Sequence, residues 1–171
     1  NLSITAKKVV IKANAAAGLF YGVQTFMQLL PKQIEGKTFA KGVKWTAPAV
    51  EITDYPRFEW RGLMFDVARH FFTKAEVKQY IDNMVKYKLN LLHLHLTDDE
   101  GWRIEIKGLP RLTTVGAYNV KKVGQFGKFT APAVDEQRTY GGFSTQDDIK
   151  ELVQYAKDRV VSILPDIDGP G

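Results

Sequence analysis

Apolar residues in the later part of the chain alternate between extended runs and helical stripes. The runs at 61–67, 89–96 and 160–164 predict β-strands. Between these runs, apolar residues recur three and four positions apart, which predicts helices that begin near Thr73 and Ser144. Strands that alternate with helices in this order indicate a parallel sheet with right-handed crossovers. The predicted fold class is therefore α/β.

Both predicted helices have a start signal and one apolar face. Thr73 and Glu76 have the spacing of a capping box, and Ser144 and Asp147 form a similar pattern. Side chains that recur at helical spacing are expected to pack on the sheet. They are Val77, Ile81, Met84 and Val85 in the first helix and Ile149, Leu152, Val153 and Ala156 in the second.

The first part of the chain has a different pattern. A short strand is predicted at 9–11, followed by a helix with Asn14 as its N-cap and Pro31 as its stop. Polar residues at 32–44 predict a hairpin or loop, and 49–53 predicts a further strand. The apolar face of the helix is expected to consist of Phe20, Val23, Met27 and Leu30.

Asp54, Tyr55 and Pro56 form a turn signal at the point where the pattern changes. The sequence therefore divides into a small α+β unit, residues 1–55, and an α/β unit, residues 56–171. Three strands with their helices are too few for a complete barrel, which has about 250 residues. The chain begins at Asn1 and stops soon after its last predicted strand, so we expect it to be a piece of a longer protein.

Polar residues gather at the ends of all three predicted strands of the α/β unit. They are Asp66, Arg69 and His70 for the first strand, His93, His95, Asp98, Asp99 and Glu100 for the second, and Asp166 and Asp168 for the third. The carboxyl ends of parallel strands meet at one edge of a sheet, where ligands bind. The sequence therefore predicts a polar pocket at this edge.

Arg69 has two possible roles at this edge. Its planar guanidinium can donate to a pair of adjacent hydroxyls or to a carboxylate of a ligand. It can equally form a structural ion pair with Asp66 or Asp98. Asp98 and Asp99 are adjacent, so in an extended chain they point to opposite sides and one of them is expected to face the pocket.

The spacing of His93 and His95 places both rings on one face of a strand. Such a pair can belong to a metal site, as in zinc-dependent barrel hydrolases, or can be hydrogen-bonded core histidines. The second alternative is favoured because no further histidine follows in the sequence. Trp102 can form a platform for a sugar ring or a packing contact. Asp166 and Asp168 also share a face, either in the pocket or in a layer that supports it.

Composition excludes several classes of function. Of the 171 residues, 44% are hydrophobic and 25% are charged, which is typical of globular domains. The net charge of +5 is spread along the chain, so nucleic acid is not expected as a partner. No apolar run reaches the roughly 20 residues of a membrane span. The chain has no cysteine, which excludes disulfides and thiolate chemistry but leaves the compartment open, with a periplasmic or secreted location favoured.

Several of these segments resemble the β-N-acetylhexosaminidases of glycoside hydrolase family 20. They are 56–72 (PRFEWRGLMFDVARHFF), 88–90, 93–103 (HLHLTDDEGWR), 140–149 and 164–168. The early segment 17–25 (AGLFYGVQT) is similar to the helix of the small domain that precedes the catalytic barrel in this family. The resemblance implies a partial (β/α)8 TIM barrel, its first three strands with their helices, preceded by part of a small α+β domain.

The resemblance also implies an activity. The parent protein is expected to remove terminal, non-reducing N-acetyl-β-hexosamine residues by substrate-assisted retaining catalysis, in which the 2-acetamido oxygen of the substrate is the nucleophile. Its partners would be glycans that contain N-acetylglucosamine or N-acetylgalactosamine, and no cofactor or metal is implied. The Asp-Glu pair that orients the acetamido group and protonates the leaving oxygen belongs to a later strand, so this piece alone is expected to be inactive.

Site residues follow from the same resemblance. Arg69 would bind hydroxyls of the terminal sugar with Asp98 beside it, and Asp168 would support the acid, with His95 and Trp102 as further candidates. Three positions depart from the family pattern: Leu94 stands where an aromatic residue is usual, Val160 where glycine is common, and Asp166 where glutamate is usual. The alternatives to the enzyme are a non-catalytic carbohydrate-binding relative and a metal-dependent barrel hydrolase that uses His93 and His95.

Overall fold

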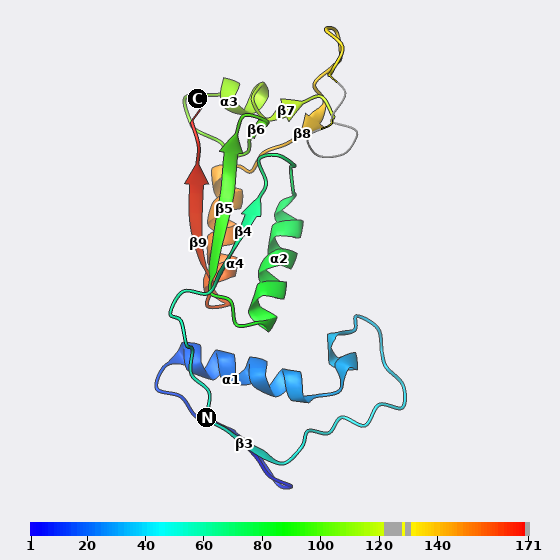
Figure 1. The fold of residues 1–171 in the computed structure, drawn as a ribbon, viewed down its shortest axis with the longest axis vertical. Coiled ribbons are helices and arrows are strands. Elements are labelled where there is room, and N and C mark those ends of the chain that lie inside the picture. The colour runs from blue at the N-terminus through cyan, green and yellow to red at the C-terminus, as the bar shows by residue number, and fades with distance from the viewer. Residues whose placement is uncertain (122–127, 129–130, 170–171) are drawn as a thin grey trace.

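The computed structural model describes residues 1–121, 128 and 131–169 of the chain. The described elements form two main sheets, with helix α1 between the first sheet and the strand starts of the second (Figure 1). No helix in these residues is long and apolar enough to cross a bilayer.

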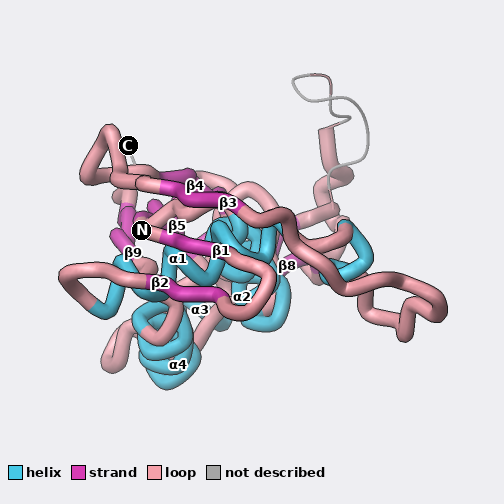
Figure 2. Tube along the Cα trace, turned by 90° about the horizontal axis from the view of Figure 1, so that it is seen from below, coloured by secondary structure: helices cyan, strands magenta, loops and turns pink. Residues whose placement is uncertain are grey.

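The first sheet is antiparallel and contains three short strands in the order β2-β1-β3 (Figure 2). They are β1 (Leu2–Ile4), β2 (Val9–Ile11) and β3 (Val50–Ile52). The predicted strands at 9–11 and 49–53 are thus present, while β1 is an addition. A 3₁₀ helix (Lys32–Glu35) begins the segment that was predicted as a hairpin or loop.

Helix α1 (Ala16–Leu29) differs from the prediction in its cap and in its buried face. Its N-cap is Ala15, without a side-chain hydrogen bond, so the assignment of Asn14 is wrong. Val23 and Met27 are exposed. The helix packs on β2 at Gly22 instead, since a Cβ added there would lie 2.4 Å from a methyl group of Ile11. Of the predicted apolar face, Phe20 contacts the core of the second sheet.

The second sheet has three parallel strands and a short antiparallel one. The parallel strands are β4 (Gly62–Asp66), β5 (Leu91–Asp98) and β9 (Ser162–Ile167), with β5 between the other two. Strand β6 (Gly101–Trp102) folds back on the end of β5. The predicted strand, helix, strand, helix, strand order is therefore confirmed.

Helices α2 (Lys74–Lys86) and α4 (Gln146–Lys157) connect the parallel strands and cover one face of the sheet. The four predicted inward residues of α2 are buried, together with Leu152 and Ala156 of α4. Val153 is exposed, contrary to the prediction, because it lies next to Leu152 and therefore about 100° away around the helix. The capping box at Thr73 is confirmed, whereas that of α4 joins Thr145 to Asp148, one residue later than predicted.

The third strand begins at Ser162, two residues later than predicted. Val160 has a φ of 59° and belongs to the turn that follows α4, so it cannot continue an extended strand. Between β6 and α4 the chain also forms a one-turn helix, α3 (Arg111–Thr114), and a small hairpin of β7 (Tyr118–Asn119) and β8 (Tyr140–Gly141). The apolar pattern did not predict these short elements.

Candidate active site

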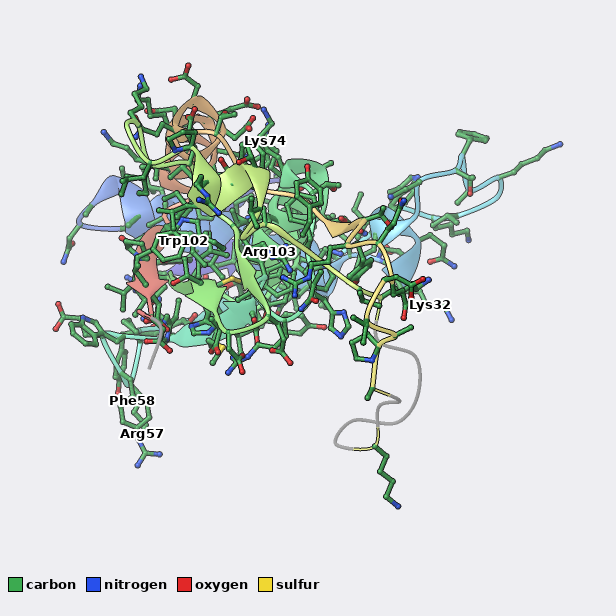
Figure 3. All side chains as sticks on the ribbon, turned by 90° about the horizontal axis from the view of Figure 1, so that it is seen from above. Lys32, Arg57, Phe58, Lys74, Trp102 and Arg103 are labelled. Atoms are coloured by element: carbon green, nitrogen blue, oxygen red, sulfur yellow. The ribbon has the colours of Figure 1, made fainter. Side chains whose placement is uncertain are left out.

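The carboxyl ends of the parallel strands meet at one edge of the sheet, viewed from above in Figure 3. Asp66 ends β4, Asp98 ends β5, and Asp166 lies near the end of β9 with Asp168 just beyond it. Arg69 follows β4 in the loop that leads to α2. The structure thus brings predicted polar groups of all three strands together, whereas the ring of His70 is exposed and its Nδ1 lies 3.0 Å from the hydroxyl of Tyr140.

Arg69 is held by carboxylates on several sides. Its guanidinium lies 2.8 Å from Asp66 Oδ2, 2.6 Å from Asp98 Oδ2 and 3.5 Å from Glu100 Oε2. The Arg69 side chain nevertheless remains 39% exposed to solvent. The structural ion pairs considered for Arg69 therefore exist, and they fix a guanidinium that a ligand can still reach.

Asp66 also shapes the backbone that carries Arg69. Its Oδ1 accepts hydrogen bonds from the backbone N–H groups of Ala68, at 2.9 Å, and Arg69, at 3.1 Å. This is the turn that aspartate favours, in which a side chain replaces a backbone acceptor. One carboxylate therefore fixes both the loop and the arginine side chain.

His95 lies between two carboxylates and is almost completely buried, with 4% exposure. Its Nδ1 is 2.7 Å from Asp166 Oδ2, and its Nε2 is 2.9 Å from Asp98 Oδ2. An imidazole can donate to two carboxylates only when both nitrogens carry protons. Burial lowers the pKa of His95, but the hydrogen bonds to Asp166 and Asp98 outweigh it and the pKa is raised above its usual value. The geometry therefore favours an imidazolium.

Asp98 is the most strongly stabilised carboxylate of the site. The backbone N–H of Asp99 and the ring of His95, assisted by the charge of Arg69, lower the pKa of Asp98 to about 2. Asp99 itself is exposed. One of the two adjacent aspartates thus faces the site and the other faces solvent, as the extended chain predicted.

His93 and His95 lie on one face of β5, as predicted, and both turn toward Asp166. His93 Nε2 and His95 Nδ1 contact the same oxygen, Asp166 Oδ2, at 2.9 Å and 2.7 Å. Both rings are thus hydrogen-bonded, as one alternative expected, but only His95 lies in the core, because the His93 side chain is 39% exposed. A different group, His95, Asp98 and Asp168, has possible ligand atoms within 4.8 Å of one another. The guanidinium of Arg69 already supplies a positive charge 2.6 Å from Asp98 there, so this group fits a metal poorly.

Two predicted residues remain, Asp168 and Trp102. The backbone carbonyl of Asp168 accepts a hydrogen bond of 2.7 Å from Thr97 Oγ1, which fixes the segment after β9 to β5. The indole N–H of Trp102 donates to the carbonyl of Ile104 at 2.7 Å, so the orientation of the ring is fixed within its own segment. Arg103, which was not among the candidate residues, is fully buried and contacts the loop after β4.

Comparisons with known proteins support the family resemblance seen in the sequence. The model of "Glycosyl hydrolase family 20, catalytic domain" matches residues 58–171, and that of "Glycosyl hydrolase family 20, domain 2" matches residues 1–55. The chain belongs to glycoside hydrolase family 20. Members of this family with similar sequences include a β-hexosaminidase of Porphyromonas gingivalis, 42% identical over 95% of this chain, and an N,N'-diacetylchitobiase of Vibrio harveyi, 40% identical over 99% of it.

Solved structures of family 20 enzymes superpose closely on the chain. The Streptomyces plicatus N-acetyl-β-hexosaminidase in complex with Thio-NAglucal has a TM-score of 0.83 and 44% identity, and covers 99% of this chain. The Vibrio harveyi exo β-N-acetylglucosaminidase in complex with N-acetylglucosamine has a TM-score of 0.81 and 38% identity. These neighbours confirm the predicted fold class, a partial TIM barrel preceded by part of a small α+β domain.

The chain is much shorter than these relatives. It spans 19% of the P. gingivalis protein, 18% of the V. harveyi chitobiase and 31% of the S. plicatus chain.

Proposed function

We propose that the full-length protein removes terminal, non-reducing N-acetyl-β-hexosamine residues from glycans by substrate-assisted retaining catalysis. The observation that carries the proposal is Arg69, which is held by three carboxylates at the ligand-binding edge of the barrel and keeps 39% of its exposure. The names of its relatives, β-hexosaminidase and chitobiase, support this substrate class.

In this proposal Arg69 binds the hydroxyls of the terminal sugar. A guanidinium presents donors in a plane, which suits two adjacent hydroxyls. Asp98 lies 2.6 Å from Arg69 and has a strongly lowered pKa, so it stays ionised and can accept a hydrogen bond from the sugar. Because these charges are already paired, substrate binding needs little rearrangement of the site.

The other residues of the site support this binding role. His95 joins Asp98 to Asp166 and fixes the position of the Asp98 carboxylate. Asp168 is proposed to support the acid of the full-length enzyme, and Trp102 to form part of the rim. The nucleophile is the 2-acetamido oxygen of the substrate, so this part of the chain binds and orients the sugar and supplies no nucleophile.

We further propose that residues 1–55 and 56–171 belong to separate domains of the full-length protein. The change of sheet between β3 and β4 supports this division.

Release of chromophore from an aryl N-acetyl-β-glucosaminide by the full-length protein tests the function. The wild type is expected to be active, and Arg69→Lys is expected to lower kcat/KM by about 100-fold because lysine loses the planar pair of donors. Arg159→Lys is the matched control, since Arg159 is also ion-paired, with Asp82 at 2.7 Å, but on the outside of α2 and α4.

Folded wild-type protein that releases no chromophore would contradict the proposal. Calorimetric binding of N-acetylglucosamine by such an inactive protein would indicate the carbohydrate-binding alternative instead.

A further inference from the structure

Arg103 is a charged side chain in the interior of the fold. It is 1% exposed and is the largest fully buried side chain in the described part of the chain. Burial lowers the pKa of Arg103, as desolvation disfavours its charged form. A buried guanidinium persists only where hydrogen bonds compensate for lost water. The identity of its acceptors therefore indicates what Arg103 does.

The acceptors are backbone carbonyls of separate segments. Arg103 Nε donates to Val67 O and Ala68 O, both at 3.1 Å, and Nη2 donates to Ala68 O at 2.7 Å. Nη1 donates to the carbonyls of Ala117 and Gly142, the latter at 3.3 Å. One side chain thus joins the loop after β4 to the segments that flank the β7–β8 hairpin.

Glycines leave the space that this guanidinium needs. A Cβ at Gly101 would lie 2.2 Å from Arg103 Cζ, and a Cβ at Gly141 would lie 2.8 Å from its Nη1. Phe71 completes the surroundings, with its ring centroid 6.0 Å from Arg103 Cζ. The arrangement depends on small residues at defined positions, which indicates that the fold provides a specific pocket for the Arg103 side chain.

The loop after β4 is held by two oppositely charged side chains. Asp66 accepts from the N–H groups of Ala68 and Arg69, while Arg103 donates to the carbonyls of Val67 and Ala68. Arg69 is the next residue along the chain. We propose that Arg103 is a positioning residue, which fixes the backbone that carries Arg69 and so places the sugar-binding guanidinium.

This inference rests on the proposed function, and Arg103→Lys in the full-length protein tests it. Lysine keeps the charge but cannot reach four carbonyls in three segments. On the aryl N-acetyl-β-glucosaminide, we expect kcat/KM to fall by about 10- to 100-fold, mainly through a raised KM. Combined with Arg69→Lys, Arg103→Lys is expected to add little, because both changes remove the same positioned guanidinium.

Arg61→Lys is the matched control. Arg61 also donates to backbone carbonyls, those of Lys88 at 2.9 Å and Phe58 at 2.8 Å, but at the opposite end of the sheet. A purely structural role for Arg103 predicts that both variants lower the melting temperature, leave KM unchanged and combine additively with Arg69→Lys. That outcome would overturn the inference.

Amide hydrogen exchange at residues 67–70 gives a readout that does not need activity. Arg103→Lys is expected to raise exchange there and Arg61→Lys is not. If the wild type is inactive, the proposed function fails, while unchanged exchange at 67–70 in folded Arg103→Lys rejects the positioning role by itself.

Should Arg103→Lys not fold, Gly101→Ala displaces the guanidinium without removing it and is expected to give the same raised KM and exchange. If neither variant folds, Arg103 belongs to the folding core and the inference is rejected.

Discussion

Four residues of the site form a row of alternating charges. Asp166 contacts His95 at 2.7 Å, His95 contacts Asp98 at 2.9 Å, and Asp98 contacts Arg69 at 2.6 Å. Each link pairs opposite charges when His95 is protonated, so this row of contacts joins Arg69 to β5 and β9. The short aspartate at 166, where the resemblance leads us to expect glutamate, reaches both histidines of β5.

Val160 has a backbone conformation that suits its side chain poorly. Its φ of 59° is costly for a β-branched residue, by about 1–2 kcal/mol. Val160→Gly is expected to raise the free energy of unfolding of the full-length protein by about 1 kcal/mol, since glycine adopts this conformation without strain. Urea unfolding measures the change.

The control for this substitution is Val153→Gly. Val153 is exposed on helix α4, where glycine should destabilise through its low helix propensity. A decrease in stability for Val160→Gly would mean that the half-buried valine contributes more through packing than it loses through strain.

The sequence predicted the members of the site better than their contacts. Arg69 and Asp98 follow from the rule that polar residues at the ends of parallel strands share one edge. The pairing of His95 with Asp166 could not be predicted, since these residues are 71 positions apart and meet only through the register of β5 and β9. Arg103 was missed because its acceptors are backbone carbonyls, which leave no pattern in a sequence.

At the scale of elements, the capping boxes of α2 and α4 differ in the residues that their carboxylates contact. Glu76 contacts Thr73 within the start of α2. Asp148 accepts from the N–H of Thr145 at 3.0 Å and from its hydroxyl at 2.7 Å, and Lys74 of α2 lies 2.6 Å away. Asp148 therefore caps α4 and joins the N-termini of both helices. Lys74 and Thr145 lower the pKa of Asp148 to about 2.

Asp148→Ala is expected to lower the free energy of unfolding by about 1–2 kcal/mol near neutral pH, because the cap and the ion pair are lost together. Since the folded pKa of Asp148 lies below its ordinary value of 3.8, its contribution is present above pH 4 and lost as the pH falls toward 2. Urea unfolding at several pH values should therefore show the wild type and variant converging in acid. Glu76→Ala is the control and is expected to cost less; an equal cost would mean that the Lys74 contact adds nothing.

Short elements were the least predictable part of the fold. Strand β6 has two residues and exists because it pairs with Thr97 and Asp98 of β5. The β7–β8 hairpin likewise joins Tyr118 and Asn119 to residues more than twenty positions later in the chain. Such pairs depend on tertiary contacts, whereas α2, α4 and the parallel strands carry enough apolar residues to be predicted from their period.

At the scale of the whole molecule, polar contacts connect α1 with the starts of the barrel strands. Lys88 Nζ lies 2.6 Å from Thr25 Oγ1 and 2.5 Å from Asp54 Oδ2, and the Tyr21 hydroxyl donates to the carbonyl of Val160 at 3.4 Å. A cavity of about 280 Å³ lies beside these contacts, lined in part by Arg61 and Tyr87. Because apolar packing is incomplete here, the orientation of α1 depends on specific polar bonds.

Lys88→Met tests that dependence in the full-length protein. Loss of the ammonium leaves Thr25 and Asp54 without their shared partner, so we expect a loss of about 1 kcal/mol in the free energy of unfolding and faster amide exchange in α1. Added salt should reduce the difference from wild type, since Asp54 is half exposed and its ion pair is screened. Lys86→Met is the control, because Lys86 lies 3.4 Å from Glu35 and is more exposed. Equal exchange in α1 for both variants would show that the helix is held by its contacts with β2, and that Lys88 contributes no more than any surface lysine.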